Sequence, residues 1–113
     1  MPNYRIVKFD EVKPVPCPCG VSRRAFLDDP DRPASMHLLQ VDGEAATHYH
    51  KNSTELYLVL EGEGRMDLDG EPVPVGPMTA LMIKPGCRHR AVGKLKIIVV
   101  PIPAFDPDDE WTD

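Results

Sequence analysis

Two of the four histidines in this chain, His48 and His50, are separated by a single residue. In an extended segment the two-residue side-chain period points both rings to one face, which suits a metal ion. Glu55 follows five residues after His50, and His89 follows a Pro85-Gly86 turn much farther along. These four side chains converge only if a sheet curls. Three imidazoles and one carboxylate would then hold a first-row divalent ion and leave positions open for substrate, as metal catalysis requires.

Two adjacent arginines are candidate substrate-binding residues. Arg23 and Arg24 are neighbours in a predicted strand, so one side chain faces the interior and the other faces outward. An inward guanidinium would bind a substrate carboxylate through two hydrogen bonds, which implies an anionic substrate.

Cys87 is a third candidate beside the metal. It lies two residues before His89 and faces the same side of an extended chain, where a thiolate is a competent ligand. A small buried residue at a turn is the plainer alternative. Cys17-Pro18-Cys19 has no second Cys or His pair at zinc-ribbon spacing, so we interpret it as structural or incidental. His37 alternates with apolar neighbours, and we favour a satisfied histidine there over a pocket wall position.

The elements that must position these residues are predicted to be short β-strands. Thirteen prolines, about twice the usual proportion, disfavour long helices and exclude a helical bundle. Asp69-Gly70 is a strong two-residue hairpin signal, because both turn positions favour positive φ. Strands are predicted over residues 4–9, 22–27, 34–41, 56–60, 64–68, 78–83 and 95–101. Many short strands with turns rich in Gly and Pro indicate an all-β sandwich or barrel.

Charge and composition narrow the class of partner. Eighteen acidic residues against thirteen basic ones give a formal net charge of −5, which argues against a nucleic-acid or anionic membrane partner. No apolar run approaches the ~20 residues of a membrane span, and the first residues do not lead into a signal-peptide core. We therefore expect a cytoplasmic protein that binds a small molecule.

The spacing of these residues resembles the first sequence motif of the cupin superfamily. That motif is a glycine, about five residues, His-x-His, three or four residues, glutamate, six residues and glycine. Here it is matched by Gly43, His48, His50, Glu55 and Gly62, with one residue fewer before the first histidine.

The second cupin motif is matched more loosely, by Gly76, Lys84-Pro85-Gly86 and His89. Lys84 stands where a proline is usual, and Gly93 stands where an asparagine is usual. Neither departure touches a candidate ligand, so they weaken the subfamily assignment rather than the metal site. The two motifs together span roughly 50 residues, and their joint order is far more specific than a lone His-x-His pair.

The resemblance implies a double-stranded β-helix, the jelly-roll cupin barrel, with one divalent transition metal inside. Its implied ligands are His48, His50, Glu55 and His89, and the ion is iron, manganese, nickel or zinc. We expect one domain, residues 1–113. Within it we distinguish an N-terminal strand and proline-rich arm (1–21), the barrel (22–104) and an acidic surface tail (105–113).

Alternation also predicts apolar side chains on both faces of the strand after Glu55. If Glu55 points inward, Tyr57 and Val59 do so too, and the leucines at 56, 58 and 60 point outward. Burying each leucine is worth roughly 1.5–3 kcal/mol, so a second layer should cover this outer face. We predict a homodimer packed sheet against sheet, with cover by the N-terminal arm as the alternative.

The resemblance leaves the reaction open, because cupins with this ligand set include dioxygenases, decarboxylases, isomerases and lyases. We favour a dioxygenase-type enzyme, with iron, acting on a small oxygen-rich substrate such as a carboxylate or sugar acid. The alternatives are a Lewis-acid isomerase or lyase, and a non-catalytic barrel that binds a small ligand. Conceivable proton carriers are Tyr49, Tyr57 and Glu61. The lack of a further dedicated base favours chemistry centred on the metal.

Overall fold

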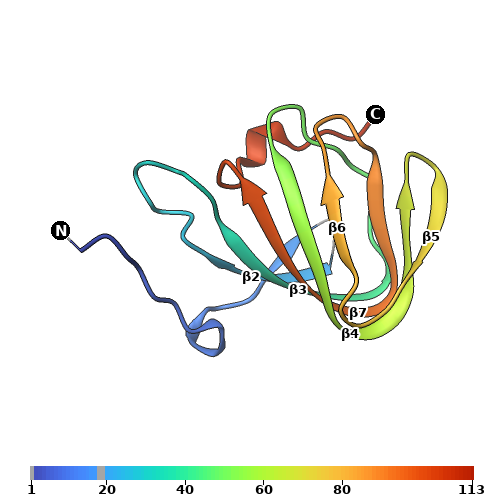
Figure 1. The fold of residues 1–113 in the computed structure, drawn as a ribbon, viewed down its shortest axis with the longest axis horizontal. Helices are drawn as coiled ribbons and strands as arrows, with labels where there is room; N and C mark the ends of the chain where they lie inside the picture. Colours follow the sequence, from blue (N-terminus) through green and yellow to red (C-terminus); the bar gives the residue numbers. More distant parts are fainter. Residues whose placement is uncertain (1, 18–19) are drawn as a thin grey trace.

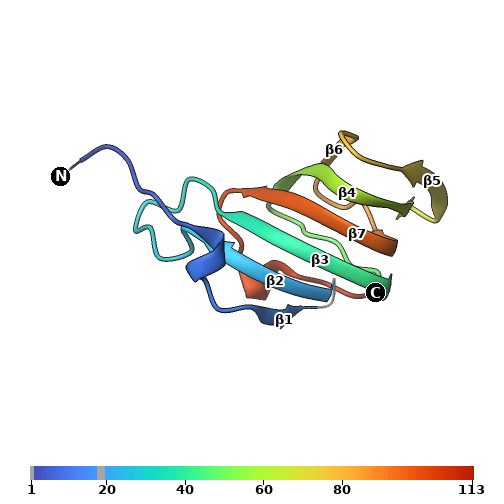
Figure 2. The ribbon, with the colours of Figure 1, turned by 90° about the horizontal axis from the view of Figure 1, so that it is seen from below.

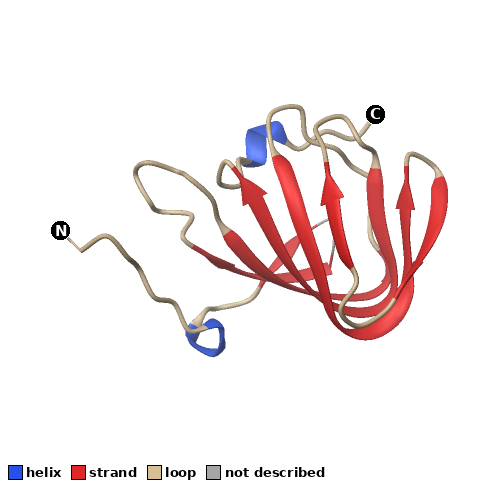
Figure 3. Cartoon of the chain, in the orientation of Figure 1, coloured by secondary structure: helices blue, strands red, loops and turns tan. Residues whose placement is uncertain are grey.

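The computed structural model describes residues 2–17 and 20–113, and their regular secondary structure is almost entirely β-strand (Figure 1 and Figure 3). The prediction for Pro18 and Cys19 lies outside these residues. The elements are η1 (Phe9–Glu11), β1 (Val15–Cys17), β2 (Gly20–Ala25), β3 (Met36–Glu44), β4 (Thr54–Leu68), β5 (Glu71–Val75), β6 (Ala80–Ile83), β7 (His89–Ile102) and η2 (Pro107–Asp109). No helix of the described chain is long and apolar enough to cross a membrane.

Within the described residues, seven strands form one antiparallel sheet in the order β1-β2-β3-β7-β4-β5, and β6 pairs with β4. Figure 2 shows this order across the sheet. In Figure 1 the long strands β4 and β7 bend sharply, so the sheet curls around an interior. This confirms the predicted all-β jelly-roll barrel.

The bend in β4 joins two segments that were predicted as separate strands, 56–60 and 64–68. Gly62 and Gly64 lie at the bend, and a Cβ on either would collide with backbone carbonyls of β7. Gly62 also has φ +91°, which a side chain would strain. Glycine at both positions therefore lets two strands approach closely while the sheet changes direction.

Turns and strand ends follow the sequence signals with some shifts. Asp69 and Gly70 have φ of +50° and +83° and connect β4 to β5, which confirms the predicted hairpin. The predicted strand 95–101 extends back to His89 as β7. This extension places a candidate ligand inside the regular sheet.

The predicted first strand, residues 4–9, is wrong. Residues 4–8 have no regular structure, and Phe9–Glu11 forms a short 3-10 helix. Tyr4 and Ile6 are 69% and 78% exposed, so their alternation has no face to pack on. The edge position beside β2 is taken instead by β1, inside the stretch predicted as an arm. Pro16 is tolerated there because an edge strand leaves one side of its backbone unpaired.

The hydrophobic core lies on the inner faces of β3, β4 and β7. Tyr57 and Val59 are 5% and 0% exposed, which confirms their predicted inward direction. The intervening leucines are partly exposed on the opposite face. The main core residues are Leu39, Val41, Tyr57, Val59, Met66, Leu95, Ile97 and Val99. This core forms the floor beneath the polar residues described next.

Candidate metal centre

The four predicted metal ligands lie together inside the barrel. His48 and His50 lie on the segment between β3 and β4, and His48 forms an antiparallel backbone bridge with His89 at the start of β7. Glu55 is the second residue of the neighbouring strand β4. One ligand atom from each side chain lies within 4.8 Å of the others, and all four residues are buried. The curled sheet thus brings together residues that are remote along the chain.

Backbone carbonyls fix the orientation of all three imidazole rings. The Nδ1 atoms of His48, His50 and His89 lie 3.1, 2.9 and 2.9 Å from the carbonyl oxygens of Ala46, Asp109 and Cys87. A carbonyl oxygen only accepts a hydrogen bond, so each Nδ1 carries the proton. The Nε2 lone pairs remain for a metal ion, an arrangement typical of metal-binding histidines.

The atoms that face one another in this cluster lack suitable partners. Within the described chain, Nε2 of His50, Nε2 of His89 and Oε1 of Glu55 are buried and make no hydrogen bond. The carboxylate oxygen lies 3.2 Å from each of the two nitrogens. Two lone pairs facing a carboxylate repel at this distance unless a cation is shared among them. The residues therefore fit a divalent transition metal, whose preferred ligands are imidazole nitrogen and carboxylate oxygen.

Burial and the neighbouring groups hold His48 and Glu55 in the ionisation states that bind a metal ion, whereas for His50 the effect of burial is outweighed by Glu55, so the pKa of His50 is raised. Burial, with a contribution from His89, lowers the pKa of His48 to about 4, so this ring is neutral at pH 7. Burial alone would raise the pKa of Glu55, but His50 and His89 outweigh it and hold the pKa below its ordinary value. Neutral imidazole and ionised carboxylate are the forms that bind metals.

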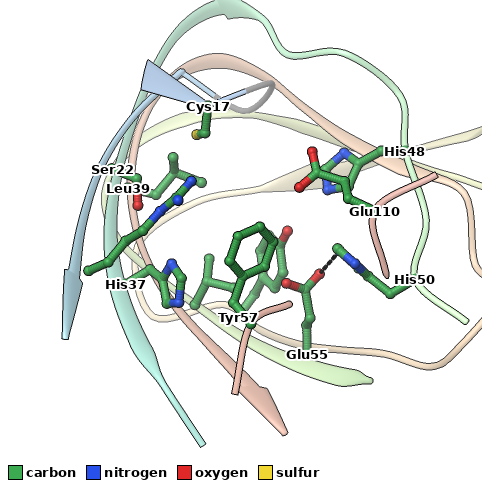
Figure 4. A pocket seen from close by; sticks show the side chains of 12 residues that line it. Cys17, Ser22, His37, Leu39, His48, His50, Glu55, Tyr57 and Glu110 are labelled. Atoms are coloured by element: carbon green, nitrogen blue, oxygen red, sulfur yellow. Dashed lines mark ion pairs between the residues drawn. The ribbon is translucent and has the colours of Figure 1, made fainter. Parts of the chain in front are cut away.

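A cavity opens beside the cluster (Figure 4), and Arg24 is one of its lining residues. The guanidinium of Arg24 lies 4.8 Å from the ring centroid of Phe105, and its Nε is buried without a hydrogen bond. Burial lowers the pKa of Arg24, which Glu110 partly offsets. Besides His48, His50 and Glu55, the lining residues are Cys17, Ser22, Arg24, His37, Leu39, Tyr57, Val99, Phe105 and Glu110.

Arg23 faces away from this cavity. Its NH1 donates hydrogen bonds to the carbonyl oxygens of Phe9 and Val12 at 3.0 and 2.9 Å. The two arginines therefore alternate as expected for a strand, with Arg24 inward. Arg23 holds the N-terminal arm and is not brought to the candidate site.

Two further candidates, Cys87 and Tyr49, also lie outside the cavity lining. The Cys87 side chain packs against the hydrophobic core, and its backbone carbonyl is the group that orients His89. The Tyr49 ring lies under the guanidinium of Arg88, 3.6 Å from its centroid. Cys87 therefore orients a candidate ligand through its backbone, and Tyr49 packs against Arg88, outside the cavity.

Tyr57 and Glu61 have opposite outcomes although both lie on β4. Tyr57 lines the cavity, and burial raises its pKa well above the ordinary value, so the phenol keeps its proton. The Glu61 side chain is 72% exposed and lies 3.7 Å from Nζ of Lys96. A register shift between Val59 and Glu61 breaks the two-residue period. The structure therefore does not bring Glu61 to the site.

Sequence reasoning missed Glu110 and undervalued His37. Nε2 of His37 lies 2.8 Å from Oγ of Ser35, and burial, followed by Arg24, lowers the pKa of His37 to about 4. Burial raises the pKa of Glu110. Alternation along β3 was a usable signal for His37. Glu110 had none, because the path of the C-terminal tail is set by long-range contacts.

Comparisons with known proteins place this geometry in context. The family model of the cupin domain matches residues 35–100. A crystal structure of a protein from Planctomyces limnophilus is 38% identical, with a TM-score of 0.91, over 99% of this chain and 97% of that one. The nucleoside dehydratase Pac13 from Streptomyces has a TM-score of 0.82 at 20% identity, over 96% and 90% of the two chains. Ectoine synthase from P. lautus has a TM-score of 0.76 at 19% identity, over 96% and 88%. The last two likenesses show a shared fold.

The chain matches only part of the length of two curated relatives. An uncharacterized protein of Methanocaldococcus jannaschii is 32% identical over 76 residues, which are 64% of this chain and 61% of that protein. Polyketide synthase CurC of Streptomyces cyaneus is 46% identical over 43 residues, which are 38% of this chain and 28% of that protein. The family model, the barrel and the two motifs agree, and the chain belongs to the cupin family.

Proposed function

We propose that this cupin is a metal-dependent enzyme acting on a small, anionic, oxygen-rich molecule. The observation that carries the proposal is that Arg24 lines the same cavity as three members of the buried His/Glu cluster, His48, His50 and Glu55. His48, His50, Glu55 and His89 would hold iron, manganese, nickel or zinc. When bound, such an ion supplies Lewis-acid polarisation or, for iron, oxygen activation.

Arg24 supports a carboxylate or sugar acid as the substrate class. Among the residues described, its guanidinium has no carboxylate within ion-pair distance, and its Nε is buried without a hydrogen bond beside the ring of Phe105. A guanidinium binds a carboxylate through two parallel charge-assisted hydrogen bonds. A substrate anchored there would place its remaining oxygen atoms toward the His/Glu cluster.

The proton-handling groups in the cavity favour Lewis-acid chemistry, an elimination or isomerisation. Glu110 has a raised pKa, so it exchanges a proton nearer to neutral pH than an exposed glutamate does. His37 is neutral and Tyr57 keeps its phenolic proton, so both can donate hydrogen bonds to a substrate oxygen. Pac13 is named a nucleoside dehydratase, and a lyase on this fold is consistent with that likeness.

A dioxygenase is the second candidate, and the ligand set is compatible with it. Three imidazoles and one carboxylate leave an iron site with open positions, which oxygen activation requires. A non-catalytic small-ligand-binding barrel would use the same cavity without turnover.

Metal analysis of protein purified without a histidine tag tests the proposal first. We expect close to one equivalent of a first-row transition metal, lost on chelation and restored by reconstitution. Each reconstituted form is then incubated with small carboxylates and sugar acids, including malonate, tartrate and glucuronate. A product whose mass is lower than that of the substrate by one water molecule supports the lyase. Oxygen consumption by the iron-loaded protein supports the dioxygenase. If the protein binds metal and ligand without turnover, the non-catalytic ligand-binding barrel is the interpretation that stands.

We also propose that a second copy of the chain covers the outer face of the sheet. Leu56 pairs with Val100 on β7 and Met82 on β6, and this apolar row remains partly exposed, with Leu56 and Met82 at 37% and 62%. The N-terminal arm is held against β2 by Arg23 and does not cover them. An apolar stripe across several strands is typical of a self-complementary interface between two-fold related subunits.

A further inference from the structure

The C-terminal tail is built into the candidate metal centre. His50 Nδ1 donates to the carbonyl oxygen of Asp109, a residue 59 positions later in the chain, at 2.9 Å. The other two histidines of the cluster, His48 and His89, have their Nδ1 acceptors two residues away in sequence, at Ala46 and Cys87. His50 is thus the ligand whose orientation depends on a distant segment.

The Asp109 side chain clamps the backbone that follows His50. Its two carboxylate oxygens accept hydrogen bonds from the backbone N–H groups of Lys51 and Asn52, both at 3.0 Å. The indole Nε1 of Trp111 donates to the same carboxylate at 3.2 Å. Asp109 is 5% exposed, so these charge-assisted bonds form in a largely dry environment. One residue therefore fixes the His50 ring through its carbonyl and the neighbouring backbone through its side chain.

The residues on either side of Asp109 hold the tail in the same place. Pro107 begins η2 and Asp106 caps it by accepting from the Asp108 N–H at 2.9 Å. Trp111 and Tyr49 exchange two backbone hydrogen bonds of 2.9 Å, and the ammonium of Lys51 lies 3.7 Å from the Trp111 ring centroid. These contacts leave the tail little freedom to shift relative to His50.

This anchoring also directs Glu110 into the cavity. Glu110 has extended backbone angles, φ −113° and ψ 116°, so its side chain points away from those of its two neighbours. The carboxylate of Asp109 and the ring of Trp111 both contact the segment that carries Lys51. Glu110 accordingly faces the cavity, which it lines together with His48 (Figure 4). The tail thus forms part of the cavity wall through Glu110 and orients the candidate metal ligand His50 through Asp109.

We propose that Asp109 is a positioning residue of the metal centre, and that metal binding and docking of the tail stabilise each other. The inference rests on the proposed metal binding. Groups that orient a metal-binding histidine typically change affinity by about 10–100-fold when they are altered. Any ligand that binds the docked state better must, by reciprocity, favour docking to the same extent.

The first test is the Asp109→Asn variant with Co(II) as a spectroscopic probe. The amide presents an N–H group to one of the two backbone donors, so the clamp cannot form intact. We expect Co(II) affinity to fall about 10–100-fold, with a changed visible d–d spectrum at saturation. The matched control is Asp108→Asn, which removes the same charge from an exposed neighbour and should match wild type. Wild-type affinity and spectrum in Asp109→Asn would overturn the proposal.

The second test needs no variant and so holds even if Asp109→Asn fails to fold. Trp111 is the chain's single tryptophan, so its fluorescence reports on the tail alone. We expect a Zn(II) titration of the metal-free wild type to change Trp111 emission and to slow amide exchange over residues 105–113. Saturation with Zn(II) without either change would refute the coupling. Wild-type protein that binds neither ion would instead refute the proposed metal binding itself.

Discussion

Strands β4 and β7 carry buried polar side chains beside the apolar core on their inner faces, and partly exposed apolar side chains on their outer faces. Glu55 and His89 are buried at 5% and 0% exposure, whereas Leu56, beside Glu55 on the same strand, is 37% exposed. Burying polar groups is costly unless they are paired, and exposing an apolar row is costly unless it is covered. These two features support the two proposals made above, a cation held inside the barrel and a second copy of the chain on its outer face.

The Glu55→Gln substitution is expected to have the largest effect on the inner face. The amide keeps the shape and can donate to a histidine Nε2, so the metal-free protein should stay folded, as judged by circular dichroism. Loss of the charged ligand should reduce transition-metal affinity by more than about 100-fold, beyond what an orienting group costs. Glu61→Gln, on the exposed part of the same strand, is the control and should bind like wild type. Equal affinity in both variants would contradict the ligand assignment.

Removing the metal should have the next largest effect. A ligand at 100 times its dissociation constant stabilises the folded state by about 2.7 kcal/mol. For a domain of this size that corresponds to a Tm roughly 10 °C higher than in the chelated protein. Differential scanning calorimetry with and without chelator measures the shift. Glu55→Gln supplies the control, since its Tm should not respond to chelation; an equal response would point to a metal bound elsewhere.

The contrast between faces also explains which parts of the site the sequence could predict. The shared direction of His48 and His50 follows from their two-residue spacing, whereas Glu55 and His89 were implied as ligands by the resemblance to the two cupin motifs. Glu61 did not follow, because the two-residue period holds only until the register shifts after Val59. A bulge of this kind depends on the partner strand, which local sequence does not reveal.

The two ends of the chain show the same limit. Alternation over residues 4–9 suggested a strand, but a strand also needs a partner edge, and β1 occupies it. Asp109 and Glu110 looked like surface acids, yet hydrogen bonds hold Asp109 against a segment about sixty residues earlier in the chain, and Glu110 lines the cavity. Pairing of this range is decided by the whole fold rather than by neighbouring residues.

Arg24 and Arg23 allow the inner and outer faces of β2 to be compared in the same way. Arg24→Met should weaken malonate binding to the metal-loaded protein about 10–100-fold, because a hydrogen-bonded charge contributes about 1.5–3 kcal/mol. Isothermal titration calorimetry measures the change. Arg23→Met should leave malonate affinity unaltered and instead release the N-terminal arm, seen as faster proteolysis before residue 15. A loss of malonate binding in the Arg23 variant alone would reverse the assignment.

The smallest effect on the metal centre should come from the outer face. Leu56→Glu and Met82→Glu place charges in the exposed apolar row, so a sheet-to-sheet dimer would have to bury them without partners. We expect the wild type to be a dimer by light scattering and both variants to be monomers with nearly unchanged metal affinity. Glu61→Gln is again the matched control and should remain dimeric. A monomeric wild type would contradict the proposed homodimer. Loss of metal binding in these variants would show that the inner and outer faces are not independent.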